Sequence, residues 1–164
     1  MTKEETINIY FTLKFPAEKI FSFIIRPESM ILYTGFFMIP GIKKVKTSDV
    51  ERRAGTLDKI LNTDGSSHES TTDIFERNKR YSLTIKNIEV SGFKKKIASP
   101  VLGFREDWIF TENKDKSTSI KRSLVTVYQK GFLNSFIVLF LVRPQLYFSL
   151  LKHHQNLLKN LSYQ

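Results

Sequence analysis

The chain has 164 residues, of which 41% are hydrophobic and 13% aromatic, and it carries 26 Lys and Arg against 16 Asp and Glu. This length and composition exclude a disordered chain and predict a single globular domain spanning residues 1–164. The chain has no cysteine, which excludes disulfide bonds, thiolate metal ligands and thiol nucleophiles. It begins without the basic and apolar regions of a secretory signal, so we expect a cytoplasmic protein.

An alternating pattern near the N-terminus predicts the first strand. Single, mostly polar residues separate the apolar side chains of Ile7, Ile9, Phe11, Leu13 and Phe15. Since side chains on a strand alternate between its two faces, this period of two predicts a strand with one buried face.

Two prolines mark the helices that follow. Pro16 suits the first turn of a helix over residues 16–26, and Pro27 disfavours helical geometry in the residue before it. We therefore expect a second short helix over residues 27–33. Pro40 is followed by glycine, which predicts the turn that leads out of this region.

The middle of the chain predicts six more strands joined largely by short turns. Asp64 and Gly65 both tolerate positive φ and indicate a tight hairpin. Residues 93–102 predict an irregular connection. With the first strand, seven strands result, and the six later ones cover residues 42–50, 56–63, 66–75, 80–88, 104–111 and 119–128.

The C-terminal segment predicts a long helix over Phe132–Leu161. Residues 132–142 are nearly all apolar, but a membrane span needs about 20 such residues. Arg143 and Pro144 would interrupt any longer window, and the pattern beyond them is amphipathic. We expect the helix to be kinked or restarted at Pro144.

The order of these segments and several short sequence motifs within them resemble a known superfamily. Residues 15–21, FPAEKIF, resemble its "P-A-E-x-V-F" entry to the first helix, and residues 69–81, ESTTDIFERNKRY, resemble its strand-turn-strand motif, with Asn78 and Lys79 in place of common prolines. Residues 104–110, FREDWIF, resemble its penultimate strand. The chain is similar to the SRPBCC or START-like superfamily of polyketide cyclase/dehydrase-like proteins.

This resemblance implies an α+β helix-grip fold. In that fold a seven-stranded curved antiparallel sheet wraps around a long C-terminal helix, with two short helices after the first strand. It also implies a cavity that binds, and in some members transports, a lipid, a polyketide or another apolar small molecule. The alternative is a cyclase, dehydratase or isomerase acting on such a substrate, and no cofactor is expected.

Apolar residues on the predicted inner faces are the candidate ligand-binding residues. Phe36, Phe37 and Met38 are expected to form a lip at the entrance. The sheet and the C-terminal helix supply the candidate wall residues, which are Phe11, Leu13, Ile60, Ile74, Leu83, Trp108, Leu124, Tyr128, Phe136, Phe140, Tyr147 and Leu151.

Three polar residues are the candidates for catalysis, namely Glu106, Arg122 and Tyr128. Glu106 shares a strand face with Trp108, and Arg122 shares one with Tyr128, which makes Arg122 a plausible partner of Glu106. A carboxylate in such a cavity suits acid-base chemistry. The alternative is that Glu106 is ion-paired or solvated.

The remaining charged residues leave several partners to consider. His153 and His154 are adjacent and about 100° apart on a helix, so we expect no metal site. The net charge is +10, yet no nucleic-acid-binding motif is present and we expect no such partner. A third function is transient association with an anionic membrane, with residues 94–96, three lysines, near its surface and residues 132–142 or the Phe36-Phe37 lip inserted. Monomer and homodimer both stay open.

Overall fold

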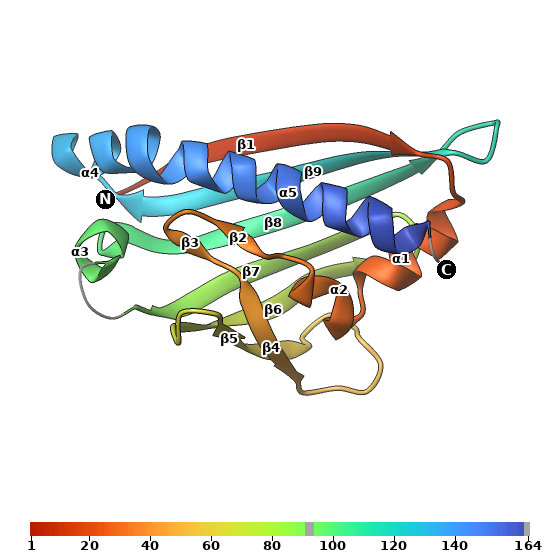
Figure 1. The fold of residues 1–164 in the computed structure, drawn as a ribbon, viewed down its shortest axis with the longest axis horizontal. Coiled ribbons are helices and arrows are strands. Elements are labelled where there is room, and N and C mark those ends of the chain that lie inside the picture. The colour runs from red at the N-terminus through yellow and green to blue at the C-terminus, as the bar shows by residue number, and fades with distance from the viewer. Residues whose placement is uncertain (91–93, 163–164) are drawn as a thin grey trace.

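The strands form one curved antiparallel sheet. The computed structural model describes residues 1–90 and 94–162. Its seven strands follow the spatial order β1-β9-β8-β7-β6-β5-β4 (Figure 1). They are β1 Thr2–Leu13, β4 Ile42–Thr47, β5 Leu57–Asn62, β6 Ser67–Glu76, β7 Arg80–Glu89, β8 Val101–Glu112 and β9 Thr118–Gln129. The predicted α+β class and seven-stranded sheet are confirmed.

The register of the central strands places Arg122 in the middle of the sheet. Arg122 on β9 lies opposite Ile9 on β1 and opposite Trp108 on β8, and Trp108 lies opposite Tyr81 on β7. All four side chains are buried. They therefore form one row across the concave face of the sheet.

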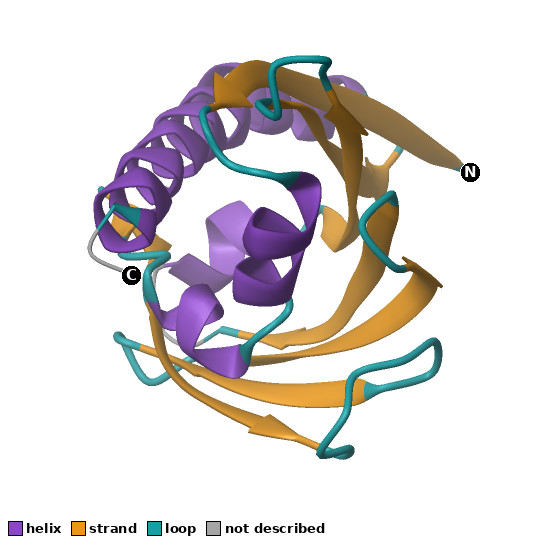
Figure 2. Ribbon diagram, turned by 90° about the vertical axis from the view of Figure 1, so that its right-hand side faces the viewer, coloured by secondary structure: helices purple, strands orange, loops and turns teal. Residues whose placement is uncertain are grey.

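Two short helices close one end of the molecule. They are α1 Ala17–Ile24 and α2 Pro27–Ile31, and Pro27 occupies the first turn of α2 as expected. Figure 2 shows the sheet curling around an interior space, with these helices at the near end and the long helix along the open side.

A small hairpin that the sequence analysis did not predict follows α2. It pairs β2 Gly35–Phe36 with β3 Ile39–Pro40. Gly35 has a φ of 71°, and a Cβ there would lie 2.3 Å from the carbonyl oxygen of Ile39. Because only glycine fits this close approach, the hairpin depends on Gly35.

Several strand boundaries also differ from the prediction, and β4 ends at Thr47 rather than at residue 50. β1 begins at Thr2 rather than Ile7, because its polar first half still pairs with β9. The connection predicted over residues 93–102 contains a short helix, α3 Lys94–Ala98, and β8 already begins at Val101. Phe93 lies outside the described residues.

The C-terminal helix is continuous over Phe132–Leu161. It consists of α4 Phe132–Phe136, a π-helical segment η1 Ile137–Val142, and α5 Arg143–Leu161. Pro144 lies in the first turn of α5, where π-helical turns change to α-helical ones without a break in the helix. A proline lacks the N–H that a regular helix needs and crowds the carbonyl four residues before it, which fits the wider π-helical turns at this point.

Two groups of buried side chains hold the layers together. One joins α1 and the end of α5 to the sheet and includes Phe21, Phe110 and Leu161. The other joins the middle of the long helix to β1 and β9 and includes Ile9 and Leu146. The middle and the end of the long helix thus pack against the sheet through side chains of its inner face.

Candidate functional site

A cavity of about 900 Å³ lies between the sheet and the long helix. Small-molecule sites in proteins span about 300–1,000 Å³, so this cavity has the size of such a site. Most of its wall is apolar and comes from α1, the sheet and the inner face of the long helix, through Ile24, Ile60, Leu83, Ile85, Trp108, Leu124, Val142, Leu146, Leu150 and Leu157.

The cavity opens at the end of the molecule where α3 lies. Among its lining residues, Asp64, Gly65, Glu89, Lys95 and Ser99 are exposed to solvent. They come from the β5–β6 turn, the end of β7, and α3 with the residue after it. This end also carries the start of the long helix (Figure 1).

One ion pair is embedded in the apolar wall. Nε of Arg122 donates to Oε1 of Glu106 at 2.5 Å, and the two side chains are only 3% and 12% exposed. The guanidinium lies 4.2 Å from the centroid of the Trp108 ring, because Trp108 faces Arg122 across the β8–β9 ladder. The predicted pairing of Glu106 with Arg122 is therefore present. Nη1 of Arg122 is buried and has no hydrogen-bond partner among residues 1–90 and 94–162.

A second polar side chain enters the cavity from the helix. Nε2 of His153 lies 3.2 Å from the carbonyl oxygen of Ser29. Since a carbonyl only accepts, Nε2 carries the proton and Nδ1 is an acceptor. Nδ1 is buried and, within the described part of the chain, has no partner. Burial, followed by the charge of Arg122, lowers the pKa of His153 well below its usual value, so the ring is neutral near pH 7.

Tyr33 adds a hydroxyl beside His153. The two rings meet edge to face with 5.5 Å between centroids, and both residues line the cavity. Burial raises the pKa of Tyr33 to about 12, against the effect of the Ser149 hydroxyl, which lowers it. The phenol therefore stays protonated. Neither residue was predicted to line the cavity, although the spacing of His153 from Leu146, Leu150 and Leu157 places it on the inner face of the helix.

Solved structures of other proteins identify the fold class of this chain. No protein-family model and no curated protein matches the chain. Ara h 8.0201 superposes with a TM-score of 0.72 at 15% identity, over 99% of this chain and 100% of its own. The chain has the helix-grip fold.

Two other solved structures share the helix-grip fold with it. Norcoclaurine synthase from Thalictrum flavum, in complex with dopamine and hydroxybenzaldehyde, gives a TM-score of 0.66 at 12% identity, over 99% of this chain and 89% of its own. An uncharacterized protein from Rhizobium leguminosarum gives 0.61 at 15% identity, over 100% and 98% of the two chains. The helix-grip fold that the sequence resemblance implied is thus confirmed.

Some of the residues predicted to bind a ligand line the helix-grip cavity. These are Ile60, Leu83, Trp108 and Leu124, all from the sheet. Of the predicted lip, only Met38 lines the cavity, whereas Phe36 and Phe37 are exposed on the outside of the β2–β3 hairpin. Whether these residues contact a ligand stays a prediction.

The other sheet candidates do not line the cavity. Phe11 packs edge to face against Trp108, and Leu13 belongs to the core beneath α1. Ile74 follows a β-bulge in β6 between Thr72 and Ile74, which shifts the alternation. The side chain that packs into the core after this bulge is therefore Phe75.

Tyr128 does not join the other catalytic candidates. It is buried on β9 but does not line the cavity. It lies six residues after Arg122 on the same strand, which corresponds to about 20 Å at 3.3 Å per residue. The structure therefore brings together Glu106 and Arg122 but not Tyr128.

The prediction of which side chains of the long helix face the cavity was wrong. Phe136, Phe140 and Tyr147 are exposed on the outer face of the helix, and Leu151 is half-buried outside the cavity. The inner face consists instead of Val138, Val142, Leu146, Leu150, His153 and Leu157. The helix is apolar on all sides near its start, so its sequence pattern does not identify the inner face.

His68 is a cavity residue near the mouth. It lines the cavity on β6, and Nδ2 of Asn62 lies 3.2 Å from its Nδ1. Burial lowers the pKa of His68 to about 4. An amide nitrogen donates, so the neutral form of the ring is the one that accepts this hydrogen bond.

A buried ion pair outside the cavity supports the scaffold. Nη1 of Arg52 donates to Oδ2 of Asp58 at 2.6 Å, and Nε donates to the carbonyl oxygen of Ile25 at 2.8 Å. Neither Arg52 nor Asp58 lines the cavity. The pair ties the end of α1 to β5 and has a structural role.

Metal-binding side chains do not gather in the described part of the chain. Residues 1–90 and 94–162 contain no group of three or more His, Asp or Glu that could hold a metal ion. His153 lines the cavity, whereas His154 lies against Phe11 with 3.9 Å between ring centroids. The two neighbouring histidines thus face different surroundings.

Proposed function

We propose that the protein binds an apolar small molecule that carries a neutral hydroxyl or similar polar group. The observation that carries this proposal is the cavity of about 900 Å³. Most of its inner wall is apolar, polar residues also lie near its mouth, and two buried polar side chains in the wall have a hydrogen-bonding atom without a partner among the described residues. An apolar site with few convergent polar groups is typical of ligand binding.

The unpaired atoms define the polar group of the ligand. Nη1 of Arg122 is a donor, and Nδ1 of the neutral His153 is an acceptor. A buried polar atom without a partner costs about 1–3 kcal/mol. A hydroxyl group accepts from the first and donates to the second, so its binding relieves both costs.

The charges around Nη1 of Arg122 and Nδ1 of His153 favour a neutral ligand. The carboxylate of Glu106 already neutralises Arg122. An anionic ligand next to Arg122 would also approach Glu106 and the lone pair of His153. A long-chain alcohol or a phenol therefore fits better than a fatty-acid anion.

A structural neighbour supports the binding of small hydroxyl-bearing molecules by this fold. Norcoclaurine synthase is described in complex with dopamine and hydroxybenzaldehyde, both small aromatic molecules with a hydroxyl group. At 12% identity this likeness concerns the fold, so the ligand class for the present chain rests on its own cavity residues.

Catalysis would require a further feature. A general acid or base must reach the proton that the substrate gains or loses, and Glu106 is the carboxylate in the inner wall of the cavity that is the candidate for this role. Its Oε1 is engaged by Arg122, so Glu106 serves first as the partner of Arg122. A cyclase or dehydratase activity that depended on Glu106 would be abolished in Glu106→Gln, whereas ligand binding would persist.

Trp108 provides a direct test of binding. It is the single tryptophan of the chain and lines the cavity, so its fluorescence reports an occupant. We would titrate the protein with dodecan-1-ol and with the matched dodecyl methyl ether, which lacks the hydroxyl proton. We expect both to change Trp108 emission and the alcohol to bind about tenfold more tightly, which is about 1.4 kcal/mol.

Two results would contradict the proposal. Equal affinity for the alcohol and the ether would refute the hydroxyl site. No response to either probe, combined with no co-purifying small molecule in native mass spectrometry of protein from its own host, would refute the binding function itself.

A further inference from the structure

The long helix exposes large apolar side chains along its outer face. Phe132 is 92% exposed, Leu133 67% and Phe140 65%, and Phe136, Tyr147 and Phe148 are also exposed. In the helix's most apolar 18-residue window, only 28% of the residues are buried inside the protein. Single exposed apolar residues are common, but a contiguous set of this kind marks an interaction surface.

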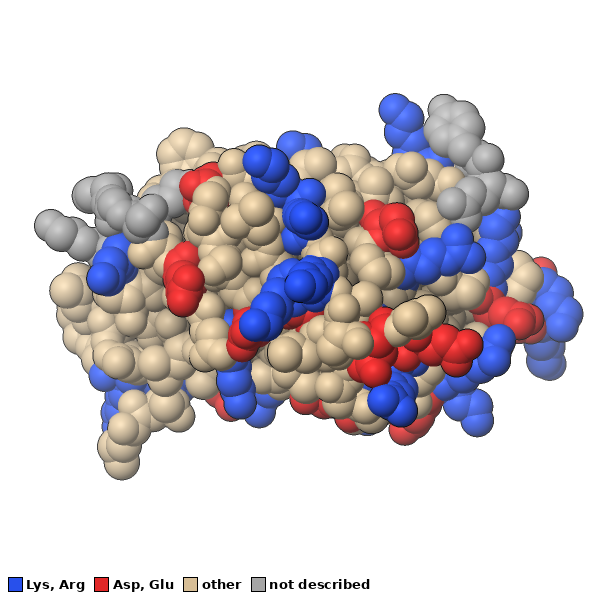
Figure 3. Space-filling view, turned by 90° about the horizontal axis from the view of Figure 1, so that it is seen from below, with Lys and Arg blue, Asp and Glu red and all other residues tan. Residues whose placement is uncertain are grey.

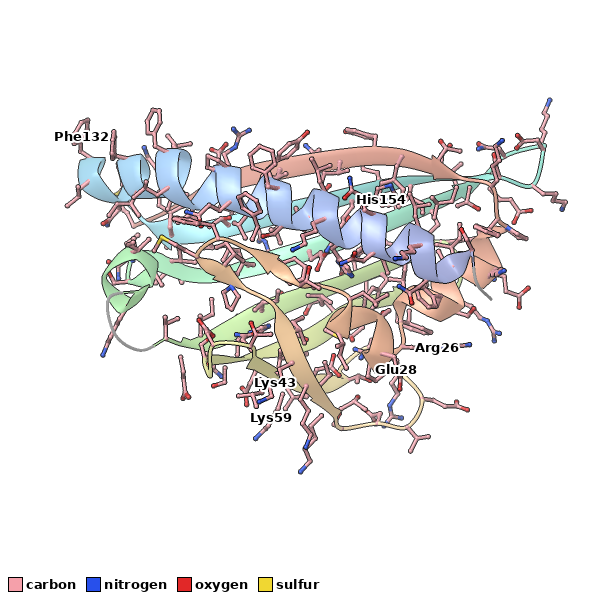
Figure 4. The ribbon with its side chains drawn as sticks, viewed as in Figure 1. Arg26, Glu28, Lys43, Lys59, Phe132 and His154 are labelled. Carbon is pink, nitrogen blue, oxygen red and sulfur yellow. The ribbon has the colours of Figure 1, made fainter. Side chains whose placement is uncertain are left out.

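These side chains lie on neighbouring turns. Phe132, Phe136 and Phe140 are spaced by four residues, and the rings of Phe136 and Phe140 have 4.9 Å between centroids. Figure 4 shows Phe132 at the free end of the helix, directed away from the sheet. We call Phe132, Phe136, Phe140, Tyr147 and Phe148 the outer aromatic stripe.

The stripe continues onto the β2–β3 hairpin. The rings of Phe36 and Phe148 have 5.4 Å between centroids, and Phe37 at the hairpin turn is 83% exposed. The same hairpin is hydrogen-bonded to the helix, since the Met38 amide donates to Oε1 of Gln145 at 3.0 Å. Met38 also lines the cavity. The stripe therefore reaches a hairpin that lines the cavity.

The charges on the long helix itself are all positive, and one of them, Arg143, pairs with Glu5 on β1 at 3.0 Å. Phe132–Leu161 contains three cationic residues and no Asp or Glu, and Lys152 and Lys159 are exposed, as is Lys130 just before the helix. On the face seen in Figure 3, by contrast, Lys and Arg are interspersed with Asp and Glu. The helix thus presents an apolar surface flanked by cations.

This combination favours a membrane over a second copy of the chain. A symmetric dimer through the stripe would bring helix cations toward helix cations, with no helix carboxylate to pair them. An anionic bilayer accepts both components, because aromatic side chains enter its interface and each nearby cation contributes about 1 kcal/mol.

We propose that the outer aromatic stripe docks on an anionic membrane surface, with the helix lying in the plane of the interface. The inner face of the helix, including Val138 and Leu150, is buried against the protein, so the helix docks without leaving the sheet. Docking places the β2–β3 hairpin, which lines part of the cavity through Met38, next to the lipid. This inference does not depend on what the cavity binds.

Vesicle flotation of the full chain tests the proposal. The probes are phosphatidylcholine vesicles with and without phosphatidylglycerol. We expect binding to the mixed vesicles that weakens at high salt, and at least tenfold weaker binding to phosphatidylcholine alone. The variant F136S/F140S should lose at least tenfold in affinity for mixed vesicles, whereas Tyr10→Ser, an exposed aromatic on β1, should bind like the parent.

A second variant keeps the test decisive if F136S/F140S folds poorly. K130E/K152E removes cations at both ends of the stripe and should weaken binding to the mixed vesicles only. No flotation of the parent, or equal loss in Tyr10→Ser, would overturn the proposal. A parent dimer that F136S/F140S converts to a monomer, without vesicle binding, would assign the stripe to a second copy and also overturn it.

Discussion

Arg122 lies directly opposite Trp108 on the β8–β9 ladder, and its guanidinium stands 4.2 Å from the centroid of the indole ring. The contact holds the guanidinium flat against the apolar wall, where cation–π attraction contributes about 1–2 kcal/mol in a desolvated setting. Nε of Arg122 donates to Glu106, and its buried Nη1 has no partner in the described part of the chain. One residue thus joins the scaffold to the proposed ligand site.

Arg122→Met should destabilise the protein by roughly 3–5 kcal/mol, because it leaves the nearly buried carboxylate of Glu106 without a partner. Chemical unfolding followed by Trp108 fluorescence measures this loss. The double variant E106L/R122M removes both charges and should recover most of the stability. A loss below about 1 kcal/mol in Arg122→Met would mean that solvent in the cavity screens the pair.

His153→Phe should lower the affinity for dodecan-1-ol about tenfold while leaving that for dodecyl methyl ether unchanged, because only the alcohol donates to Nδ1. The phenylalanine ring keeps the shape of the contact with Tyr33. His154→Phe is the matched control, since His154 does not line the cavity. An equal effect of the two changes would remove His153 from the proposed site.

Leu150→Ala and Leu133→Ala test the observed phase of the long helix with the same chemical change. Leu150 is 2% exposed and Leu133 is 67% exposed. We expect Leu150→Ala to lower the free energy of unfolding by about 2–3 kcal/mol and Leu133→Ala by less than about 0.5 kcal/mol. The opposite order in chemical unfolding would contradict the packing of the helix.

We expect the free energy of unfolding to fall as the pH is lowered from about 6.5 to about 4, because the histidines have lowered pKa values in the folded protein. The pKa of His68 is lowered to about 4 by burial, and burial also lowers the pKa values of His153 and His154. In this window the unfolded chain, with an ordinary histidine pKa near 6.5, binds more protons than the folded one. Stability is therefore full above the unfolded pKa and is lost as the pH falls toward the folded value.

Chemical unfolding at several pH values measures this dependence. Each histidine kept neutral adds at most about 1.4 kcal/mol per pH unit to the slope. His68→Gln keeps an acceptor for the Asn62 amide and should reduce the slope by the share of His68. An unchanged slope in this variant would show that His68 titrates alike in both states.

Near neighbours in the sequence determined much of the fold. The alternation from Ile7 to Phe15 predicted β1, and Asp64 with Gly65 predicted the β5–β6 turn. The period of two also placed Glu106 beside Trp108 and suggested Arg122 as its partner, which the structure contains. These features could be read locally, because strand periodicity and turn geometry depend on residues close in the chain.

Only the tertiary structure decided the phase of the long helix and the position of Ile74. The helix is apolar on nearly all sides around Phe136 and Phe140, so its inner face is set by the sheet that packs against Val138 and Leu150. The bulge before Ile74 reverses which side chain of β6 points inward. Neither effect leaves a periodic signal in the sequence.

The polar part of the candidate site depends in the same way on contacts between distant residues. His153 is oriented by the carbonyl of Ser29, 124 positions away in the chain. Its neutral state results from burial beneath the sheet and from the nearby charge of Arg122. Hydrogen bonds and dielectric surroundings of this kind exist only after the chain has folded, so the sequence determined the scaffold and the packing of distant segments determined the site.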